Sequence, residues 1–247
     1  MSICMTVRHA RVEREKNDFR FTLSIPHLDI HRGRMMAVLG PSGCGKSTLL
    51  DMLALILRPV EAQAFHMYLD SGRSKFDLFQ ASDARLTAVR GNHIGYVLQS
   101  GGLLSFLSVR DNILLPGRLL GVPEKVLDAG LKTLVSRLGI AGQLNKKPQH
   151  LSGGQRQRTA IARALITRPA IVFADEPTAA VDQETAWEIC QIFHSLAKDM
   201  GTALVTVSHD QMLMRQFCDD VVEFSVHHRS PSDIEATVNV IEGMHEQ

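Results

Sequence analysis

Polar and apolar residues alternate through much of the first third of this chain. Residues 20–25 and 28–30 alternate most clearly, and a period of two predicts short antiparallel strands within residues 1–33. Further strand and turn signals stand at residues 65–70 and 71–74. Together these stretches predict an antiparallel β part that comprises residues 1–33 and 60–80.

Predominantly apolar runs form a second kind of segment. Such runs are typical of strands in a parallel sheet, because both faces of those strands contact other apolar groups. They stand at residues 35–39, 93–98, 170–174 and 202–207. Helical patterns are predicted between them, at residues 48–57, at residues 82–89 before Gly91, and at residues 186–200. Strands that alternate with helices predict an α/β fold with a mostly parallel sheet. Two shorter stretches, residues 221–224 and 235–241, are expected to be edge strands.

The helical period dominates the middle of the chain. Residues 109–120 and 124–138 carry apolar residues at spacings of three and four. A further helix is expected to open near Ser152 and to run to about residue 167. These segments predict an α-helical part over residues 100–167.

A glycine-rich segment joins the first apolar run to the helical pattern that follows it. It consists of Gly40, Pro41, Ser42, Gly43, Cys44, Gly45, Lys46 and Ser47, and Thr48 comes next. Strand, glycine-rich turn, Lys-Ser and helix are typical of a phosphate-binding loop, in which backbone N–H groups and a helix N-terminus face an anion. Lys46 is placed to contact β- and γ-phosphates, and Ser47 to ligate Mg²⁺. The alternative is an ordinary glycine-rich turn.

Composition excludes several classes of function. A net charge of +1 gives no electrostatic argument for nucleic acid or for an anionic membrane surface. Four cysteines without CxxC spacing indicate neither a zinc site nor a disulfide framework, which favours reduced thiols in the cytosol. No secretory signal is visible, and the longest apolar run is far below the ~20 residues that span a bilayer. A role at a membrane would therefore depend on a partner.

Three further motifs accompany the phosphate loop. Ser152, Gly153, Gly154 and Gln155 follow a leucine, Asp175 and Glu176 end one apolar run, and His209 follows the next. With these motifs the chain resembles, over nearly its whole length, the nucleotide-binding subunit of an ATP-binding cassette (ABC) transporter. The resemblance implies one ABC ATPase domain with a P-loop NTPase core of RecA type at residues 34–59, 92–99 and 168–247. It also implies that ATP and Mg²⁺ bind, and that the helical part carries the signature motif.

The resemblance assigns a role to each motif residue. Asp175 is implied to hold Mg²⁺ together with Ser47 and Gln99, since oxygen ligands suit this hard cation. Glu176 is implied to be the general base for the attacking water. His209 is implied to contact the γ-phosphate, although a single histidine in isolation is more often structural.

The signature motif implies a second copy of the chain. Ser152, Gly153 and Gly154 open a helix, so free N–H groups and the helix dipole form an anion site there. In the family this site, with Gln155, faces the γ-phosphate held by the other cassette of a head-to-tail dimer. Asp182 falls in the loop that the family calls the D-loop.

The chain departs from the family in two places. The D-loop usually begins with a serine, and here it begins Ala179-Ala180, so a hydroxyl is missing. The family usually stacks adenine on an aromatic residue upstream of the phosphate loop. Here Phe19 and Phe21 are the nearest rings, and they are either adenine contacts or core residues of a strand.

The segment around Gln99 favours one subgroup. Residues 94–104 and 107–113 are similar to the lipoprotein-releasing and macrolide-exporter group, although the run also occurs loosely in importers. The resemblance implies docking of an integral membrane permease near the segment after Gln99, with simple packing as the alternative. The chain would then lie at the cytoplasmic face of the inner membrane. Its transported substrate and direction would be set by those partners.

A function outside transport is the competing hypothesis. It is an ABC ATPase that drives assembly or regulation, of the iron–sulfur or cell-division type. DNA-repair cassettes are disfavoured because they insert a long coiled coil between phosphate loop and signature, and only about a hundred residues separate the two here. Tandem translation-type cassettes are disfavoured because one copy of each motif is present.

Overall fold

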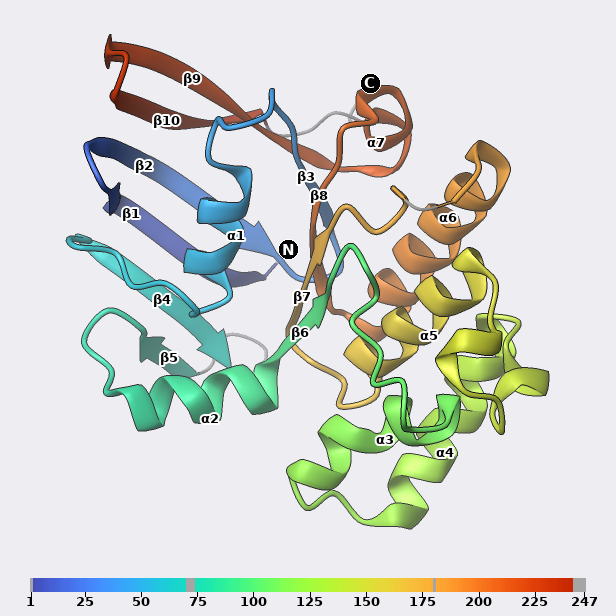
Figure 1. The fold of residues 1–247 in the computed structure, drawn as a ribbon. Helices are drawn as coiled ribbons and strands as arrows, with labels where there is room; N and C mark the ends of the chain where they lie inside the picture. The colour runs from blue at the N-terminus through green and yellow to red at the C-terminus, as the bar shows by residue number, and fades with distance from the viewer. Residues whose placement is uncertain (1, 70–73, 180, 242–247) are drawn as a thin grey trace.

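The centre of the molecule is a ten-stranded mixed sheet (Figure 1). The computed structural model describes residues 2–69, 74–179 and 181–241, and every structural statement below concerns these residues. The strands are β1 (Ile3–Lys16), β2 (Phe19–His31), β3 (Met35–Val38), β4 (Ala64–Leu69), β5 (Ser74–Asp77), β6 (Ile94–Val97), β7 (Ile171–Asp175), β8 (Ala203–Val207), β9 (Asp220–Ser230) and β10 (Asp233–Ile241). Their order across the sheet is β5-β4-β1-β2-β10-β9-β3-β8-β7-β6.

Parallel and antiparallel pairing divide this one sheet. β9, β3, β8, β7 and β6 pair in parallel, and all of these except β9 carry the apolar runs. β5, β4, β1 and β2 pair antiparallel. The prediction of an α/β fold with a mostly parallel core and an antiparallel β part is confirmed.

The prediction that the tail forms edge strands is wrong. β9 and β10 pair antiparallel with each other, and they join β3 on one side to β2 on the other. They lie inside the sheet and connect its two parts. A local pattern of polar and apolar residues does not report which distant strand will pair with a segment, so this arrangement had no sequence signal.

The first hairpin also differs from the prediction. The two short strands expected within residues 20–30 are one continuous strand, β2, which passes through Pro26. Across from Pro26, His9 takes a positive φ of 45°. An irregularity in the partner strand is the usual way in which a sheet accepts a proline that has no N–H to donate.

The helices are α1 (Lys46–Leu53), α2 (Asp83–His93), α3 (Val109–Leu119), α4 (Glu124–Arg137), α5 (Gly153–Leu165), α6 (Gln183–Met200) and α7 (Gln211–Phe217). α1 ends earlier than predicted, because Leu55 takes a left-handed φ of 62°. α2 continues through Gly91 instead of ending before it. α7 and β5 were not predicted, and residues 70–73 of the expected strand and turn lie outside the described residues.

Two apolar clusters cover the two faces of the sheet. One contains α1, α2 and the inner face of the antiparallel strands, with Leu23, Leu50 and Phe65 fully buried. The other lies between the parallel strands and helices α3 to α7. In Figure 1, α3 and α4 lie at the bottom of the view, below the parallel strands. Among the described helices, none is both long and apolar enough to span a bilayer.

Candidate nucleotide-binding site

The phosphate loop lies between β3 and α1, at the carboxyl end of the parallel strands. Gly45, the residue before α1, has a φ of 107°, and a Cβ at this position would lie 2.6 Å from Cζ of Phe21. Both conditions require glycine, because an L side chain is strained at this φ and would collide with the ring. The loop can therefore lie directly on the buried ring of Phe21.

Lys46 opens α1, and its charge is directed back into the loop. Its Nζ donates to the carbonyl oxygens of Gly40 and Pro41, at 2.8 Å each, and the residue is 7% exposed. Among the described residues, no carboxylate forms an ion pair with it. A nearly buried cation held only by carbonyl groups is well suited to bind an incoming anion such as a phosphate.

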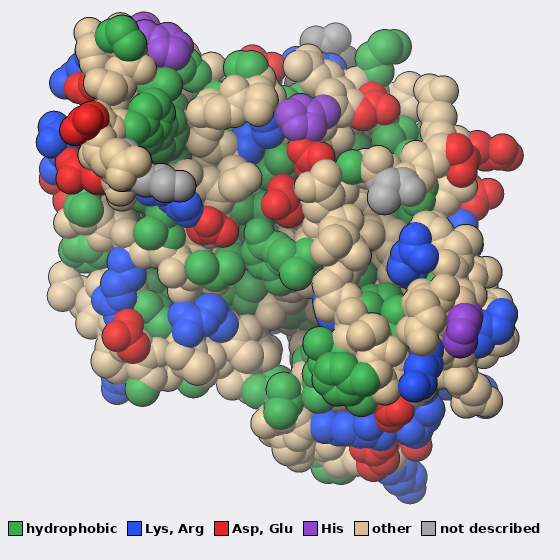
Figure 2. Space-filling view, viewed as in Figure 1, with side chains coloured by type: hydrophobic (Ala, Val, Ile, Leu, Met, Phe, Trp, Pro, Cys, Tyr) green, Lys and Arg blue, Asp and Glu red, His purple; other side chains and the backbone are tan. Residues whose placement is uncertain are grey.

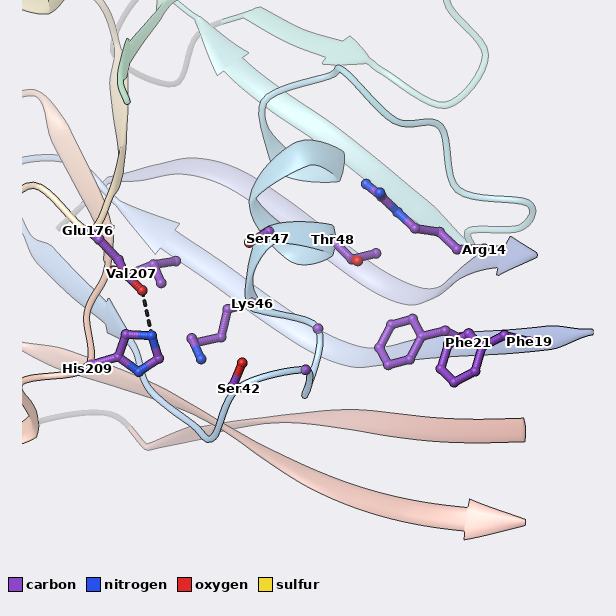
Figure 3. Close-up of a pocket in the computed structure, with 12 residues that line it drawn as sticks. Arg14, Phe19, Phe21, Ser42, Lys46, Ser47, Thr48, Glu176, Val207 and His209 are labelled. Atoms are coloured by element: carbon purple, nitrogen blue, oxygen red, sulfur yellow. Dashed lines mark ion pairs between the residues drawn. The ribbon is translucent and has the colours of Figure 1, made fainter. Parts of the chain in front are cut away.

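A cavity of about 470 Å³ opens in front of this loop (Figure 3). Its lining residues are Arg14, Phe19, Phe21, Ser42, Gly43, Gly45, Lys46, Ser47, Thr48, Glu176, Val207 and His209. Figure 3 shows Lys46, Glu176 and His209 at one end of the cavity, and Arg14 with the two phenylalanines at the other. A cavity of this size suits a nucleotide.

Two of the predicted residues, Gln99 and His209, contact the carboxylate of a third, Glu176. Glu176 follows β7, and its Oε1 lies 2.6 Å from Nε2 of His209, which follows β8. Its Oε2 accepts a hydrogen bond of 3.2 Å from Nε2 of Gln99, which follows β6. The parallel order β6-β7-β8 brings the three side chains together, because adjacent parallel strands end at the same edge of the sheet.

The backbone of Glu176 is held in an unfavourable conformation. Its φ is 46°, and its N–H donates to the carbonyl of Val207 at 3.0 Å. A left-handed φ in a residue other than glycine costs roughly 1–3 kcal/mol and persists only where surrounding contacts impose it. Such residues cluster at active sites, which agrees with the chemistry expected of Glu176.

The neighbouring acid, Asp175, lies close to other carboxylates. Burial raises the pKa of Asp175 above its ordinary value, and the nearby Glu176 and Asp51 raise it further against the opposing charges of Lys46 and His209. A divalent cation would relieve this repulsion, so the donor set fits Mg²⁺. Asp175, Gln99 and the exposed Ser47 provide the oxygen atoms that Mg²⁺ prefers.

The signature motif lies at a different place. Ser152 caps α5: its side chain accepts from the N–H of Gln155, whose own side chain accepts from the N–H of Ser152. The start of α5 borders a second cavity of about 700 Å³. Its lining residues are Ser152, Gly153, Gly154, Gln155, Arg158, Ala179, Val181, Asp182 and Thr185. The two cavities share no lining residue, so one chain does not bring its signature motif to its own phosphate loop.

Asp182 also has a local structural role. It caps α6, accepting hydrogen bonds from the N–H of Thr185 at 2.9 Å and from its hydroxyl at 2.8 Å. These bonds hold the pKa of Asp182 below its ordinary value. Asp182 also lines the second cavity, which we call the signature cavity because it borders the signature motif. Ala180, in the same loop, lies outside the described residues.

The two phenylalanines at the far end of the nucleotide cavity differ in how exposed they are. Phe21 is 6% exposed and belongs to the core beneath the loop, whereas Phe19 is 42% exposed. Arg14, which the sequence did not single out, lines the cavity beside them and forms an ion pair with Asp51 of α1. No motif marks Arg14, since only the pairing of β1 with β2 brings it to this position.

Cys44 of the phosphate loop is buried, and burial raises the pKa of its thiol, which disfavours a reactive thiolate.

A phosphate loop before a helix, with carboxylates at the ends of adjacent parallel strands, defines a P-loop nucleotide hydrolase. Residues 23–179 match the ABC transporter family, and the chain belongs to this family. It is an ATP-binding cassette with the ATPase chemistry of that class, as the sequence predicted.

Curated relatives agree with the predicted subgroup. The chain is 36% identical over 186 residues to the lipoprotein-releasing system ATP-binding protein LolD of Colwellia psychrerythraea, which covers 75% of this chain and 69% of that protein. It is 40% identical over 190 residues to LolD of Bdellovibrio bacteriovorus, covering 77% and 83%. A third relative is the macrolide export ATP-binding/permease protein MacB 1 of Aeromonas hydrophila, 41% identical over 189 residues, which are 76% of this chain and 28% of that protein.

Solved structures confirm the fold. The dimeric post-hydrolysis structure of the ATP-binding cassette MJ0796, bound to ADP and Pi, superposes with a TM-score of 0.74 at 28% identity and covers 96% of this chain and 98% of that chain. The structure of cbiO1 from Clostridium perfringens, part of the ABC transporter complex cbiONQ, has a TM-score of 0.74 at 26% identity and covers 90% and 85%.

Proposed function

We propose that this chain hydrolyses ATP as one of two cassettes that close head to tail on the nucleotide and drive a membrane permease. The observation that carries this proposal is the separation of the signature cavity from the nucleotide cavity within one chain. An anion site at the start of α5 has no phosphate of its own chain to bind. A second copy, turned by a two-fold axis, would supply that phosphate.

The side chains suggest how hydrolysis proceeds. Lys46 would exchange its two carbonyl partners for the β- and γ-phosphates, and the loop N–H groups would hold the remaining oxygens. Glu176 would accept the proton of the attacking water, while Gln99 and His209 fix the position of its carboxylate. Mg²⁺, when bound, would neutralise phosphate charge, and Ser47, Gln99 and Asp175 would hold it.

The same proposal gives the helical part its function. Residues 100–167 would act as a subdomain that carries the signature motif, beside the antiparallel part at residues 1–33 and 60–80 and the RecA-like core at residues 34–59, 92–99 and 168–247. Gly153 and Gly154 of the second copy would contact the γ-phosphate, together with Ser152 and Gln155. ATP would then stabilise the closed pair, and hydrolysis would release it.

Mixed dimers test the head-to-tail arrangement. Lys46→Ala removes the phosphate-loop cation, and Gly153→Asp adds a negative charge at an anion site where the first turn of a helix tolerates Asp. Each variant alone is expected to be inactive. A 1:1 mixture restores one intact site in each mixed dimer, or about a quarter of the wild-type sites under random pairing. A mixture as inactive as its components would contradict the composite site.

The permease is expected to dock on the segment after Gln99. Phe106 in this segment is 70% exposed and Leu98 is 45% exposed, which is typical of an interaction surface. The relatives named LolD and MacB favour a partner of the lipoprotein-release or mechanotransmission type, and a peripheral location at the cytoplasmic face of the inner membrane.

Co-purification from detergent extracts tests this docking. Phe106→Ser is expected to lose the membrane subunit and to keep the ATPase activity of the isolated chain. Leu119→Ser is the matched control, since Leu119 is 78% exposed at the end of α3. Purification of the wild-type chain with soluble partners alone would favour an assembly or regulatory ATPase.

A further inference from the structure

The chain turns sharply just after Gln99, and this turn lies on the signature helix α5. Gly101 and Gly102 have φ values of 73° and 56°, and the N–H of Gly101 donates to the carbonyl of Leu98 at 2.8 Å. A Cβ on Gly101 would lie 3.7 Å from Cβ of Ala160, a fully buried residue of α5. The turn therefore lies so close to α5 that a methyl group on Gly101 would contact the helix.

Arg163 of α5 holds the same turn by hydrogen bonds. Its Nη1 donates to the carbonyl of Gly102 at 2.7 Å, and its Nη2 donates to the carbonyl of Gly101 at 2.8 Å. Burial lowers the pKa of this guanidinium, and within the described part of the chain no carboxylate pairs with it. A desolvated guanidinium without a counter-ion is costly, so its two-pronged contact with the turn has to offset that cost.

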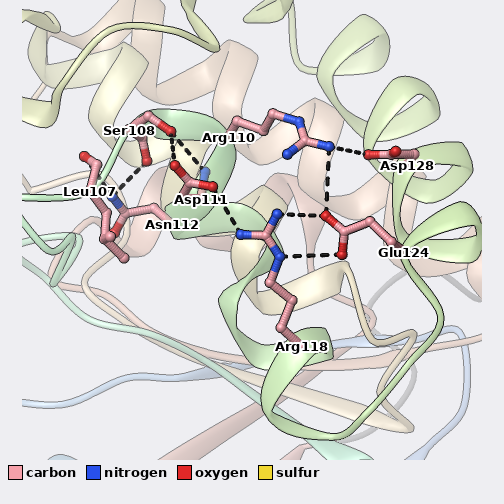
Figure 4. Close-up of polar contacts among 8 residues, drawn as sticks. All are labelled: Leu107, Ser108, Arg110, Asp111, Asn112, Arg118, Glu124 and Asp128. Atoms are coloured by element: carbon pink, nitrogen blue, oxygen red, sulfur yellow. Dashed lines mark hydrogen bonds and ion pairs between the residues drawn. The ribbon is translucent and has the colours of Figure 1, made fainter.

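A second side chain holds the residues that follow. Asn112 of α3 is completely buried, and its Oδ1 accepts from the N–H of Leu104 at 2.7 Å. Its Nδ2 donates to the carbonyls of Leu104 at 3.0 Å and Ser108 at 2.9 Å. Figure 4 shows the amide of Asn112 directed at Leu107 and Ser108, at the start of α3. Residues 101–108 are thus held by α5 at one end and by α3 at the other.

Ion pairs connect α3 to the next helix. Arg110 and Arg118 of α3 pair with Asp128 and Glu124 of α4, and Arg118 also pairs with Asp111 (Figure 4). In Figure 2 charged side chains crowd this end of the molecule, at the lower right. The segment after Gln99 is therefore bound to helices α3 and α5, whereas Gln99 itself contacts Glu176 at the end of β7.

α5 also approaches β6 of the sheet closely. A Cβ on Gly95 of β6 would lie 2.5 Å from the carbonyl oxygen of Ala164, so strand and helix touch at the backbone. The signature motif stands at the opposite end of α5. Ala164 and Arg163 are adjacent in α5. Their partners, Gly95 and the turn at Gly101 and Gly102, lie just before and just after Gln99 in the chain.

We propose that Arg163 is a positioning residue that fastens the segment after Gln99 to the signature helix, so that the contact of Gln99 with Glu176 and the orientation of the signature motif change together. The proposal rests on the function proposed above, in which Gln99 acts at the nucleotide. Arg163 lines neither of the two cavities, and acts only through the turn at Gly101 and Gly102.

A double-mutant cycle on the full chain tests this proposal. ATPase activity at saturating Mg²⁺ and ATP is measured for Gln99→Ala, Arg163→Met and the double variant. Each single change is expected to lower kcat about 10-fold with KM changed less than about 3-fold, and the double variant is expected to be no slower than the slower single variant. Arg163→Lys is expected to recover part of the rate, because an ammonium can still bond one of the two carbonyls.

Control variants distinguish a loss of the contact between Arg163 and the turn from a general loss of stability. Arg137→Ala removes an arginine of α4 whose partners are Ser195 and Asp199, and it is expected to leave kcat unchanged. If Arg163→Met lowers the melting temperature strongly, Arg163→Lys and Arg163→Gln replace it in the cycle.

Two results would overturn the proposal. Independent losses, with the double variant about 100-fold slower than wild type, would leave Arg163 a purely structural residue while the proposed role of Gln99 stands. A Gln99→Ala variant with wild-type kcat would remove both the role of Gln99 and the fastening that acts through it.

Discussion

Two carboxylates of the same sheet have opposite surroundings. Asp29, on β2 in the antiparallel part, accepts hydrogen bonds from Arg8 at 2.9 and 2.7 Å and from the hydroxyl of Thr6. Burial raises the pKa of Asp29, but the hydrogen bonds from Arg8 and Thr6 outweigh it and hold the pKa below its ordinary value. Asp175, at the end of β7, has its pKa raised by burial and by the charges of Glu176 and Asp51.

The surroundings of the two aspartates suggest different roles: Asp29 stabilises the fold, whereas Asp175 is suited to bind a cation. Asp29 has its counter-ion within the chain, so its ionised form is favoured in the native state. Asp175 is partly buried and repelled by neighbouring acids, so its ionised form is less favoured than that of an ordinary aspartate. Perturbed acids of the second kind mark functional sites, because a cation can relieve the repulsion.

The largest effect is expected at the acid next to Asp175. Glu176→Gln removes the proposed base while keeping the shape of the side chain and a partner for Gln99. Turnover is expected to fall by about 10²- to 10⁴-fold, with ATP binding retained. Steady-state ATPase assays and ATP-dependent thermal shifts measure the two quantities, and size exclusion with ATP should detect a dimer. A monomer with undiminished turnover would remove Glu176 as the base.

Neutralising the two aspartates should move stability in opposite directions. Asp29→Asn leaves the half-buried Arg8 without its counter-ion, and it is expected to cost about 1–2 kcal/mol. Asp175→Asn removes a repelled charge, and in the absence of nucleotide it is expected to raise the melting temperature by a few degrees. Calorimetry at about pH 7.5, well above the ordinary aspartate pKa of about 3.9, compares the two variants. Equal losses in both would contradict the distinction drawn between these acids.

The smallest expected effect is the pH dependence of the stability that Asp29 contributes. Because the pKa of Asp29 is lower in the folded chain than its ordinary value of 3.8, its contribution to stability is present above that value and is lost as the pH falls through the folded pKa. The difference in melting temperature between wild type and Asp29→Asn is therefore expected to shrink below about pH 3.8. A difference that stays constant or grows in acid would show that Asp29 is not held as an ion.

Local chemistry explains which parts of the site could be predicted. Glycine at a left-handed φ, Lys46 at a helix start, and Glu176 after an apolar strand each have a reason that is present in a few adjacent residues. The convergence of Gln99, Glu176 and His209 follows from the parallel pairing of β6, β7 and β8, and the alternation of strands and helices predicts such pairing. The caps at Ser152 and Asp182 are likewise local, since each side chain bonds an N–H three residues ahead.

Other contacts had no signal in the sequence. Arg163 and the turn that it holds are about sixty residues apart along the chain, and no period or motif connects them. Arg14 reaches the nucleotide cavity only because β1 pairs with β2. The tail looked like edge strands because its patterns are short and partly polar, whereas pairing on both sides buries the start of β9 and the middle of β10.

The sequence by itself determined the phosphate loop, the acids, the signature motif and the α/β alternation, because each depends on residues close together in the chain. The tertiary structure alone decided the order of the ten strands, the surroundings of Asp29 and Asp175, and the distance between the signature motif and the phosphate loop. Those features depend on contacts between distant segments, which form only when burial of both apolar clusters selects one arrangement of the whole chain.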